Sequence, residues 1–480
     1  MSDRYDLVVL GGGTGGLVSA LVAAGVGARV ALIERDRIGG ECLWTGCVPS
    51  KSLIAAAALA HGMRHADSVG LAPTDPNVDF AGVMDRVQRA VRTIEAEDPP
   101  ERLRDAGIDV VHASGRFAGP GRIEVDGREL GWRSAIVATG STALVPPIPG
   151  LDDGGSLTTD TVWELRELPG RLVVLGGGPV GCELAQAFAR LGSHVTVIEI
   201  ADRLLLKEDP RASELIASRL RAEGVDVRLG QRGSEVRRRP GGEHELVLEG
   251  SGEVLSFERI IVATGRAPST AGLGLETVGV ELGRGGAVAV NSRLRTTARG
   301  IFAVGDVTGL LPFTHVAAHH ARVATPNALF KTRGKVSKTI PWVTFTDPEV
   351  GRVGLTEEQA RERWGEKVKI TEFEYAKLDR AITAGDAYGF AKLIADPRGR
   401  LVGATVAAPG GGDTIAELTA WISRGEKIDA VSRTVHAYPT LAEGPARAAD
   451  EYLEARYASP RMRALTQRAL AFLRLLPRPR

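Results

Sequence analysis

Two stretches of the chain share one pattern of apolar, glycine and polar positions. Residues 7–34 (LVVLGGGTGGLVSALVAAGVGARVALIE) align without a gap on residues 172–199 (LVVLGGGPVGCELAQAFARLGSHVTVIE), and 14 of the 28 positions are identical. Each copy has an apolar run of strand length, a glycine turn, an Ala-rich stretch of helical length and a second apolar run that ends in Glu. The repeat therefore predicts two βαβ units.

The glycine turns have the spacing of a dinucleotide-binding loop. The first glycine makes the tight turn, the second lets a pyrophosphate approach the backbone, and the third lets the helix pack close to the strand. The acidic residue 23 positions after the first glycine is placed to accept hydrogen bonds from a ribose. These residues are Gly11, Gly13, Gly16 and Glu34 in the first copy and Gly176, Gly178, Gly181 and Glu199 in the second. Turns needed only for packing are the alternative.

Glu199 also bears on which pyridine nucleotide the second copy binds. A carboxylate at that place repels a 2′-phosphate, which favours NAD(H) over NADP(H). Arg203 lies close by in the sequence and could bind a 2′-phosphate, so NADP(H) stays possible as the cofactor.

Composition excludes several classes of protein. Among 480 residues, 60 Lys and Arg offset 59 Asp and Glu for a net charge of +1, so there is no overall field to attract nucleic acid. The 59 glycines cluster in short loops instead of repeating at a fixed period, which excludes collagen. Three cysteines cannot build a disulfide framework. We expect a cytoplasmic protein of about three domains.

Two of the cysteines lie in the segment GGECLWTGCVPSKSL, residues 39–53. Cys47 is followed by Pro49 and an Ala-rich stretch, so it is predicted to open a helix, where the dipole and free N–H groups favour a thiolate. Four residues separate it from Cys42. Half of a zinc site is the alternative, but the sequence offers no second cysteine pair and no spaced Cys-His cluster to complete it. Cys182 is interpreted as a small buried residue.

This combination of motifs resembles the FAD-dependent pyridine-nucleotide disulfide oxidoreductases of class I, which include dihydrolipoamide dehydrogenase, glutathione reductase and mercuric reductase. Further matches are ATG at residues 138–140 and 263–265, IFAVGDVTG at 301–309 and PWVTFTDPEVGRVGLTE at 341–357. The resemblance implies an α/β fold of two Rossmann-type domains, for FAD and NAD(P), followed by an α+β dimerisation domain of a homodimer.

The resemblance also implies roles for individual residues. Electrons pass from the pyridine nucleotide through FAD to a Cys42–Cys47 disulfide, with Cys47 next to the flavin and Cys42 facing the substrate. Lys51 and Glu183 form an ion pair beside the flavin. FAD is held by the first glycine loop with Glu34, Lys51, Thr139, Gly140 and Asp306, and the nucleotide by the second loop with Glu199 and Gly265.

The segment TVHAYPTLAEG, residues 434–444, departs from the pattern of family members that act on thiols. Those members carry a histidine before the proline, paired with a glutamate five residues after that histidine. Here Tyr438 precedes Pro439, and Glu443 keeps the matching place. A phenol titrates near 10 and an imidazole near 6.5, so Tyr438 is predicted to be a poor general base. His436 is the nearest histidine, and a structural and a catalytic role both stay open for it.

The predicted activity is therefore NAD(P)H-dependent reduction of a disulfide or of a thiolate-bound soft metal, as in mercuric reductase, which also has tyrosine in this region. The C-terminal sequence LRLLPRPR lacks the cysteine pair with which mercuric reductases end. Three alternatives stay open: dihydrolipoyl dehydrogenase, an NADH:quinone or diaphorase-type flavoenzyme, and a non-catalytic flavin-bearing partner in a larger complex. Substrates are small molecules, and no nucleic acid partner is expected.

The predicted domain boundaries follow from these motifs. They are an FAD domain at 1–150, an NAD(P)H domain at 151–270, a central return to the FAD domain at 271–335, a dimerisation domain at 336–455 and a basic tail at 456–480. In the family the acid-base residues come from the other subunit, so the resemblance implies that Tyr438 and Glu443 act across the dimer.

The tail contains seven arginines and no acidic residue. Its apolar residues have helical spacing, which predicts an amphipathic helix. Such a helix either packs on the dimer with its arginines in solvent or makes weak contact with an anionic membrane surface, which would give a peripheral location.

Overall fold

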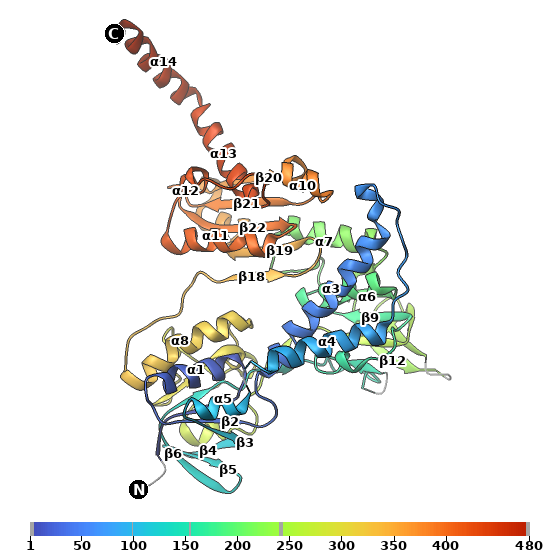
Figure 1. The fold of residues 1–480 in the computed structure, drawn as a ribbon, viewed down its shortest axis with the longest axis vertical. Coiled ribbons are helices and arrows are strands. Elements are labelled where there is room, and N and C mark those ends of the chain that lie inside the picture. The colour runs from blue at the N-terminus through green and yellow to red at the C-terminus, as the bar shows by residue number, and fades with distance from the viewer. Residues whose placement is uncertain (1–3, 98, 153–154, 240–242, 477–480) are drawn as a thin grey trace. The chain divides into compact units, whose positions relative to one another are not determined.

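The structure, a computed structural model, describes residues 4–97, 99–152, 155–239 and 243–476. The chain divides into two compact units (Figure 1). Unit 1 comprises Met1–His65, Pro73–Leu204 and Leu220–Ser337, and unit 2 comprises Ala66–Ala72, Leu205–Arg219 and Lys338–Arg480.

The first sheet of unit 1 has seven strands in the order β3-β2-β1-β6-β5-β4, with β17 beside β6. The three residues Leu7, Val8 and Val9 of β1 have no exposed surface, as expected for a strand of a parallel sheet covered on both faces. Strands β1, β2, β3, β6 and β17 pair in parallel, and β4 and β5 continue the sheet in antiparallel. The strands are β1 (Arg4–Leu10), β2 (Val30–Glu34), β3 (Ile108–His112), β4 (Gly115–Gly119), β5 (Arg122–Val125), β6 (Arg128–Val137) and β17 (Ile301–Ala303).

The second repeat forms a separate parallel sheet in the order β11-β10-β9-β15-β8. A meander of three antiparallel strands, β12, β13 and β14, and a two-stranded ribbon of β7 and β16 complete unit 1. The bounds are β8 (Ser156–Leu157), β9 (Arg171–Leu175), β10 (His194–Glu199), β11 (Asp226–Leu229), β15 (Arg259–Val262), β12 (Gly233–Arg238), β13 (His244–Leu248), β14 (Val254–Phe257), β7 (Ser141–Ala143) and β16 (Arg266–Pro268).

Helices connect the two nucleotide-binding sheets of unit 1. The long helix α3 packs against α4 and α6, and α1 packs against α8 (Figure 1). By length and composition the helical stretch Gly40–Arg64 would also be sufficient to cross a membrane. Because α3 packs against α4 and α6 within unit 1, we interpret it as part of the fold. The helices are α1 (Thr14–Gly25), α2 (Gly40–Trp44), α3 (Cys47–Arg64), α4 (Phe80–Glu95), α5 (Pro100–Asp105), α6 (Pro179–Leu191) and α8 (Thr314–Phe330).

Unit 2 is built on an antiparallel sheet in the order β18-β19-β22-β21-β20. Helices α11 and α13 pack on this sheet and share an apolar core with it. The segment Leu205–Arg219, with most of α7 (Pro210–Ala222), belongs to this unit. The other elements are β18 (Pro341–Thr344), β19 (Glu349–Gly354), β20 (Lys369–Glu374), β21 (Phe390–Ala395), β22 (Leu401–Ala408), α9 (Glu357–Trp364), α10 (Asp379–Ala384), α11 (Gly411–Arg424), α12 (Ile428–Arg433), α13 (Glu443–Tyr457) and α14 (Pro460–Leu475).

Candidate active site

The cysteine segment is fixed against the first glycine loop. The backbone N–H of Gly39 donates to Gly12 O at 2.9 Å, and Gly39 forms a parallel bridge with Gly13. A Cβ on Gly40 would lie 2.5 Å from the Cα of Gly13, so only glycine allows this approach. The start of α2 is therefore packed directly against the first nucleotide loop.

Cys42 lies in α2 and Cys47 is the first residue of α3. The pKa of Cys47 is lowered to about 6 because the Cys42 thiol donates to its sulfur, with further help from the hydroxyl of Thr314 and the charge of Lys51. Cys47 Sγ lies 3.6 Å from Thr314 Oγ1, which belongs to the first residue of α8. The pKa of Cys42 is raised by the hydrogen bond to Cys47 and by burial. In the reduced pair Cys47 is thus the thiolate and Cys42 holds the proton.

Lys51 and Glu183 come from α3 and α6, which pack together. Lys51 Nζ lies 2.7 Å from Glu183 Oε2, and the Glu183 side chain is buried. Lys51 is one turn along α3 from Cys47, so the same cation that pairs with Glu183 also favours the Cys47 thiolate.

A chain of polar contacts runs from the cysteine segment to Asp306. Glu41, directly before Cys42, lies 2.6 Å from Arg266 Nη2. Arg266 Nε donates to Ser141 Oγ at 2.8 Å, and Ser141 Oγ donates to Asp306 Oδ2 at 2.8 Å. Burial raises the pKa of Glu41 to about 7, although Arg266 opposes the shift. Asp306 lies in the 3-10 helix η5 (Gly305–Thr308).

Both glycine loops fit a bound pyrophosphate. Neither Gly13 before α1 nor Gly178 before α6 has a side-chain cap, so the helix N-termini keep N–H groups for an anion. No atom lies within 4 Å of a Cβ placed on Gly178. A Cβ on Gly16 or Gly181 would meet a loop carbonyl oxygen at 1.8 or 1.9 Å, as close helix packing requires. The first glycines, Gly11 and Gly176, have φ of 105° and 108°.

The two acidic residues have the same geometry in both copies. Glu34 Oε2 accepts the N–H of Gly12 at 2.5 Å, and Glu199 Oε2 accepts that of Gly177 at 2.6 Å. Each carboxylate therefore closes its own loop at the end of its strand. The oxygens keep further lone pairs for a ribose diol.

The residues after each ATG tripeptide lie together on the β7–β16 ribbon. Thr139 Oγ1 donates to Ser269 O, and Gly140 O accepts the N–H of Ser269. Gly265 O accepts the N–H of Leu144 at 2.9 Å. These contacts join the strand ends of the two nucleotide folds.

The predicted acid-base residues lie in unit 2. Tyr438 is 67% exposed, and its hydroxyl donates to Asp379 Oδ2 at 2.8 Å. This hydrogen bond and the carboxylate charge raise the pKa of Tyr438. Glu443 is the buried first residue of α13 and accepts the N–H of Thr440. The structure thus gives Tyr438 a different carboxylate partner, Asp379.

His436 is held on both sides of its ring. Its Nδ1 lies 2.9 Å from Thr434 O and its Nε2 lies 3.0 Å from Glu417 Oε2. These contacts favour a structural role for His436.

Four side chains at the cysteine pair were not predicted from the sequence. Glu41 directly precedes Cys42, and Ser141 and Arg266 each follow an ATG tripeptide. Their positions next to recognised motifs could have identified these three residues from the sequence. Thr314 follows no recognised motif, and only the fold brings it to Cys47.

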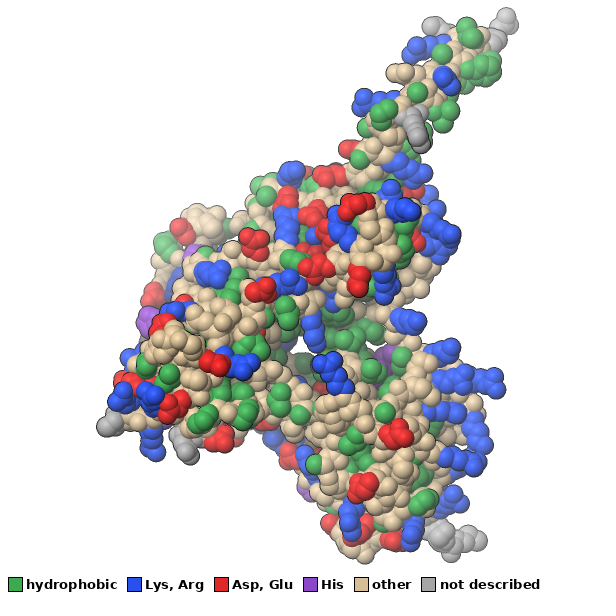
Figure 2. Space-filling model, turned by 180° about the vertical axis from the view of Figure 1, so that it is seen from behind, with side chains coloured by type: hydrophobic (Ala, Val, Ile, Leu, Met, Phe, Trp, Pro, Cys, Tyr) green, Lys and Arg blue, Asp and Glu red, His purple; other side chains and the backbone are tan. Residues whose placement is uncertain are grey.

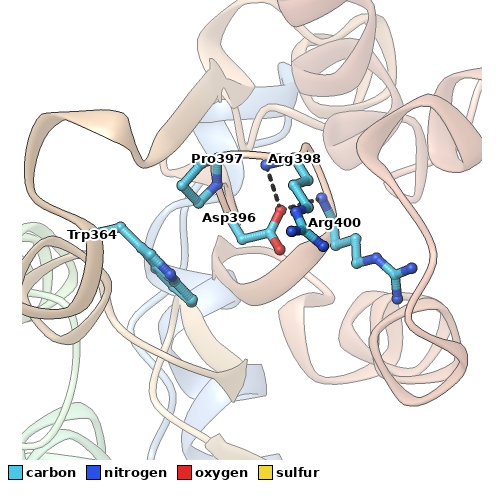
Figure 3. A pocket seen from close by; sticks show the side chains of 5 residues that line it. All are labelled: Trp364, Asp396, Pro397, Arg398 and Arg400. Carbon is cyan, nitrogen blue, oxygen red and sulfur yellow. Dashed lines mark hydrogen bonds between the residues drawn. The ribbon is translucent and has the colours of Figure 1, made fainter.

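A surface hollow in unit 2 contains none of the predicted site residues. Trp364, Asp396, Pro397, Arg398 and Arg400 line it (Figure 3). Asp396 Oδ1 accepts the N–H groups of Arg398 and Arg400, which closes the turn between β21 and β22. The polar residues of the hollow thus stabilise a turn, and we assign no ligand to it.

Comparison with known proteins places the geometry in a family. Residues 5–321 match the pyridine nucleotide-disulphide oxidoreductase family, and residues 340–449 match the dimerisation domain of the same family. The chain belongs to this family. The predicted fold class is confirmed, and this oxidoreductase uses FAD and a pyridine nucleotide and forms a homodimer.

The relatives of the oxidoreductase include proteins named for two different activities. It is 35% identical to a mercuric reductase of Bacillus cereus, over 92% of this chain and 70% of that one. It is 36% identical to a dihydrolipoyl dehydrogenase of Thermus scotoductus, over 93% and 97%. A solved structure described as a Cu(II) complex of the HOCl-induced flavoprotein disulfide reductase RclA from Escherichia coli has a TM-score of 0.83 and 30% identity, over 92% and 98%. The predicted class of activity, FAD-dependent disulfide oxidoreductase, is thus confirmed.

Proposed function

We propose that the oxidoreductase uses NADH to reduce a disulfide or a thiolate-bound soft metal ion at Cys42 and Cys47. The observation that carries this proposal is the pair of free sulfurs of Cys42 in α2 and Cys47 at the start of α3, one held as a thiol and one as a thiolate. Such a pair supplies both a nucleophile and a proton.

We propose the following residues for the cofactors, since the uncapped loops and the carboxylates fit them. FAD supplies two-electron transfer between the pyridine nucleotide and the cysteine pair. Its holding residues are Gly11, Gly13, Gly16, Glu34, Lys51, Thr139, Gly140 and Asp306, and those for the pyridine nucleotide are Gly176, Gly178, Gly181, Glu199 and Gly265.

With a disulfide substrate, the Cys42 sulfur attacks one substrate sulfur. The substrate S–S bond breaks, the first thiolate leaves with the Cys42 proton, and a mixed disulfide forms. The Cys47 thiolate then attacks the Cys42 sulfur, releases the second substrate thiolate and closes the Cys42–Cys47 disulfide. The substrate has gained two electrons, and the cysteine pair has lost two. The second step needs Cys47 as a thiolate. Because its pKa is lowered, Cys47 is ionised at neutral pH without a separate general base.

A soft metal bound to two small thiolates places less demand on acid-base chemistry. Both cysteine sulfurs replace the thiolates as ligands, and one departing thiolate takes the Cys42 proton. No other base is needed. The relatives named mercuric reductase and the neighbour described as a Cu(II) complex support this class of substrate.

Tyr438 suits such substrates better than it suits a free dithiol. Its pKa is raised by Asp379, so at neutral pH the phenol donates hydrogen bonds and does not remove a proton. We propose that Tyr438 and Glu443 act in the homodimer at the cysteine pair of the partner subunit, where the phenol would stabilise a departing thiolate.

This account predicts how Tyr438→His changes the substrate range. An imidazole at this place adds a base, so oxidation of dihydrolipoamide should rise by roughly 10²-fold, while reduction of thiolate-bound Hg²⁺ should change little. Turnover is measured with dihydrolipoamide, glutathione disulfide, Hg²⁺, Cu²⁺ and quinones. Tyr438→Phe is the matched control and should not raise dihydrolipoamide turnover. Wild-type turnover with quinones alone would contradict the proposed function.

NADH is proposed as the electron donor because Glu199 ends β10, where its carboxylate would repel a 2′-phosphate. Its Oε1 accepts the N–H of Ala201 at 2.8 Å in addition to the bond from Gly177. A held carboxylate cannot swing away from the phosphate charge.

Glu199→Gln should therefore shift the ratio of kcat/KM for NADPH over NADH upward by roughly 10-fold, equivalent to about 1.4 kcal/mol. The amide keeps the shape of the side chain and removes its charge. Glu34→Gln makes the same change in the first copy and should leave the ratio unaltered. An unchanged ratio in Glu199→Gln would assign the preference to other residues.

A further inference from the structure

The helix α14 is an exposed helix at the end of unit 2. It follows α13 (Figure 1), and every side chain described from residue 463 to residue 476 is exposed. Phe472 is 63% exposed and Leu465 is 61% exposed. Large apolar side chains of this number are not left in water without a partner in most monomeric folds.

Most of the large apolar side chains of α14 form one stripe. They recur at intervals of three and four residues, so they lie on the same face of the helix. The stripe consists of Met462, Leu465, Ala469, Phe472 and Leu473, while Leu470 and Leu475 lie beyond its edges. None of these side chains belongs to the apolar clusters described in unit 2, so the stripe is open to a partner outside the subunit.

The charges on α14 are all of one sign. Arg468 flanks the apolar stripe on one side, and Arg463 and Arg474 lie beyond its other edge, while the sequence from 455 to 476 has no Asp or Glu. Figure 2 shows hydrophobic and basic side chains along the helix. Two copies of α14 placed side by side would bring like charges together without a compensating carboxylate. An anionic surface complements this pattern, because arginine stems can cover its apolar part while the guanidinium groups bind phosphate.

We propose that α14 binds a membrane surface rich in anionic lipid, with the apolar stripe among the acyl chains and the arginines at the phosphates. The helix lies in the plane of the interface and does not span the bilayer. This attachment is independent of the reaction proposed for the cysteine pair.

Sedimentation of the full-length holoenzyme with vesicles tests this proposal. We expect binding to vesicles of phosphatidylcholine with about one-third phosphatidylglycerol, and binding roughly 10²-fold weaker to phosphatidylcholine alone. Replacing Arg463, Arg468 and Arg474 by Gln should produce a similar loss. Replacing Leu465, Phe472 and Leu473 by Ser should abolish binding to both vesicles. Turnover with soluble acceptors should stay at the wild-type level.

A matched control separates α14 from charge in general. Replacing Arg237, Arg238 and Arg239, which are exposed at the end of β12, by Gln removes the same charge and should leave vesicle binding unchanged. Equal loss in this control would overturn the proposal. The proposal would also be overturned if a chain ending at Ser459 still binds vesicles. A third contrary outcome is that neither the full-length nor the truncated protein binds vesicles and the truncated protein dissociates to monomers, because α14 would then pack on the second copy.

Discussion

Replacing either Cys42 or Cys47 by serine should lower turnover with disulfide and thiolate-bound metal substrates by at least about 10³-fold. A serine hydroxyl neither forms the disulfide nor ionises near neutral pH, so both the nucleophile and the electron store are lost. The measurement is acceptor-dependent NADH oxidation by the holoenzyme. Cys182→Ser is the matched control, because Cys182 is fully buried in α6 and its Sγ donates to Gly177 O, a bond that a hydroxyl also makes.

The two cysteines should be distinguishable by pH. Cys47 has a lowered pKa, so its thiolate is present above about pH 6 and is lost as the pH falls through that value. Alkylation of the reduced enzyme should follow this titration. In Cys42→Ala the main hydrogen-bond donor to Cys47 is gone, and the midpoint of the alkylation titration should move up toward about 8.5.

Turnover of Cys42→Ser gives the outcome that decides the proposed site. A variant that still reduces quinones but no longer reduces disulfides or metal ions would fit the proposal, whereas full turnover with disulfides and metal ions would contradict it.

Lys392→Met should destabilise the oxidoreductase by about 3–5 kcal/mol. Lys392 lies in β21, its side chain is 5% exposed, and its Nζ contacts Asp209 at 2.8 Å, Glu357 at 2.8 Å and Glu372 at 3.0 Å. Methionine fills a similar volume but leaves the buried carboxylate of Asp209 and the half-buried carboxylates of Glu357 and Glu372 without this cation. Denaturant unfolding followed by tryptophan fluorescence measures the loss.

Lys369→Met is the control for this effect, because Lys369 is exposed at the start of β20 in the same sheet. Its cost should stay within about 0.5 kcal/mol. Adding Asp209→Asn to Lys392→Met should recover part of the loss, since one uncompensated charge is removed. A Lys392→Met protein as stable as the wild type would show that the carboxylates find other partners.

The direction of the pH effect follows from the same contacts. The pKa of Lys392 is raised although burial opposes it, because the three carboxylates bind its charge. A raised value means that the contribution of Lys392 is fully present below its unfolded pKa and is lost only at strongly alkaline pH. The pKa of Glu357 is lowered by Lys392 and Arg361 against the effect of burial, so its contribution disappears as the pH falls.

The sequence alone determined the nucleotide folds, because their constraints are local. A tight turn, a close backbone approach and a helix packed on a strand each require glycine at a fixed place, and Gly11, Gly16 and their counterparts Gly176 and Gly181 record that requirement. The position of Cys47 at a helix start was likewise readable from the residues that follow it. The roles given to individual residues around it rested on resemblance, and the described contacts bring Lys51 and Glu183 together.

Only the tertiary structure decided which distant side chains meet. Thr314 reaches Cys47 from α8, and Asp379 replaces Glu443 as the partner of Tyr438. Lys392 stands in the apolar run FAKLIA, which by pattern is a plain buried strand, and its carboxylate partners come from α9, β20 and the segment Leu205–Arg219. Periodicity reports whether a side chain faces the core, but the charge that it meets there depends on elements far away in the sequence.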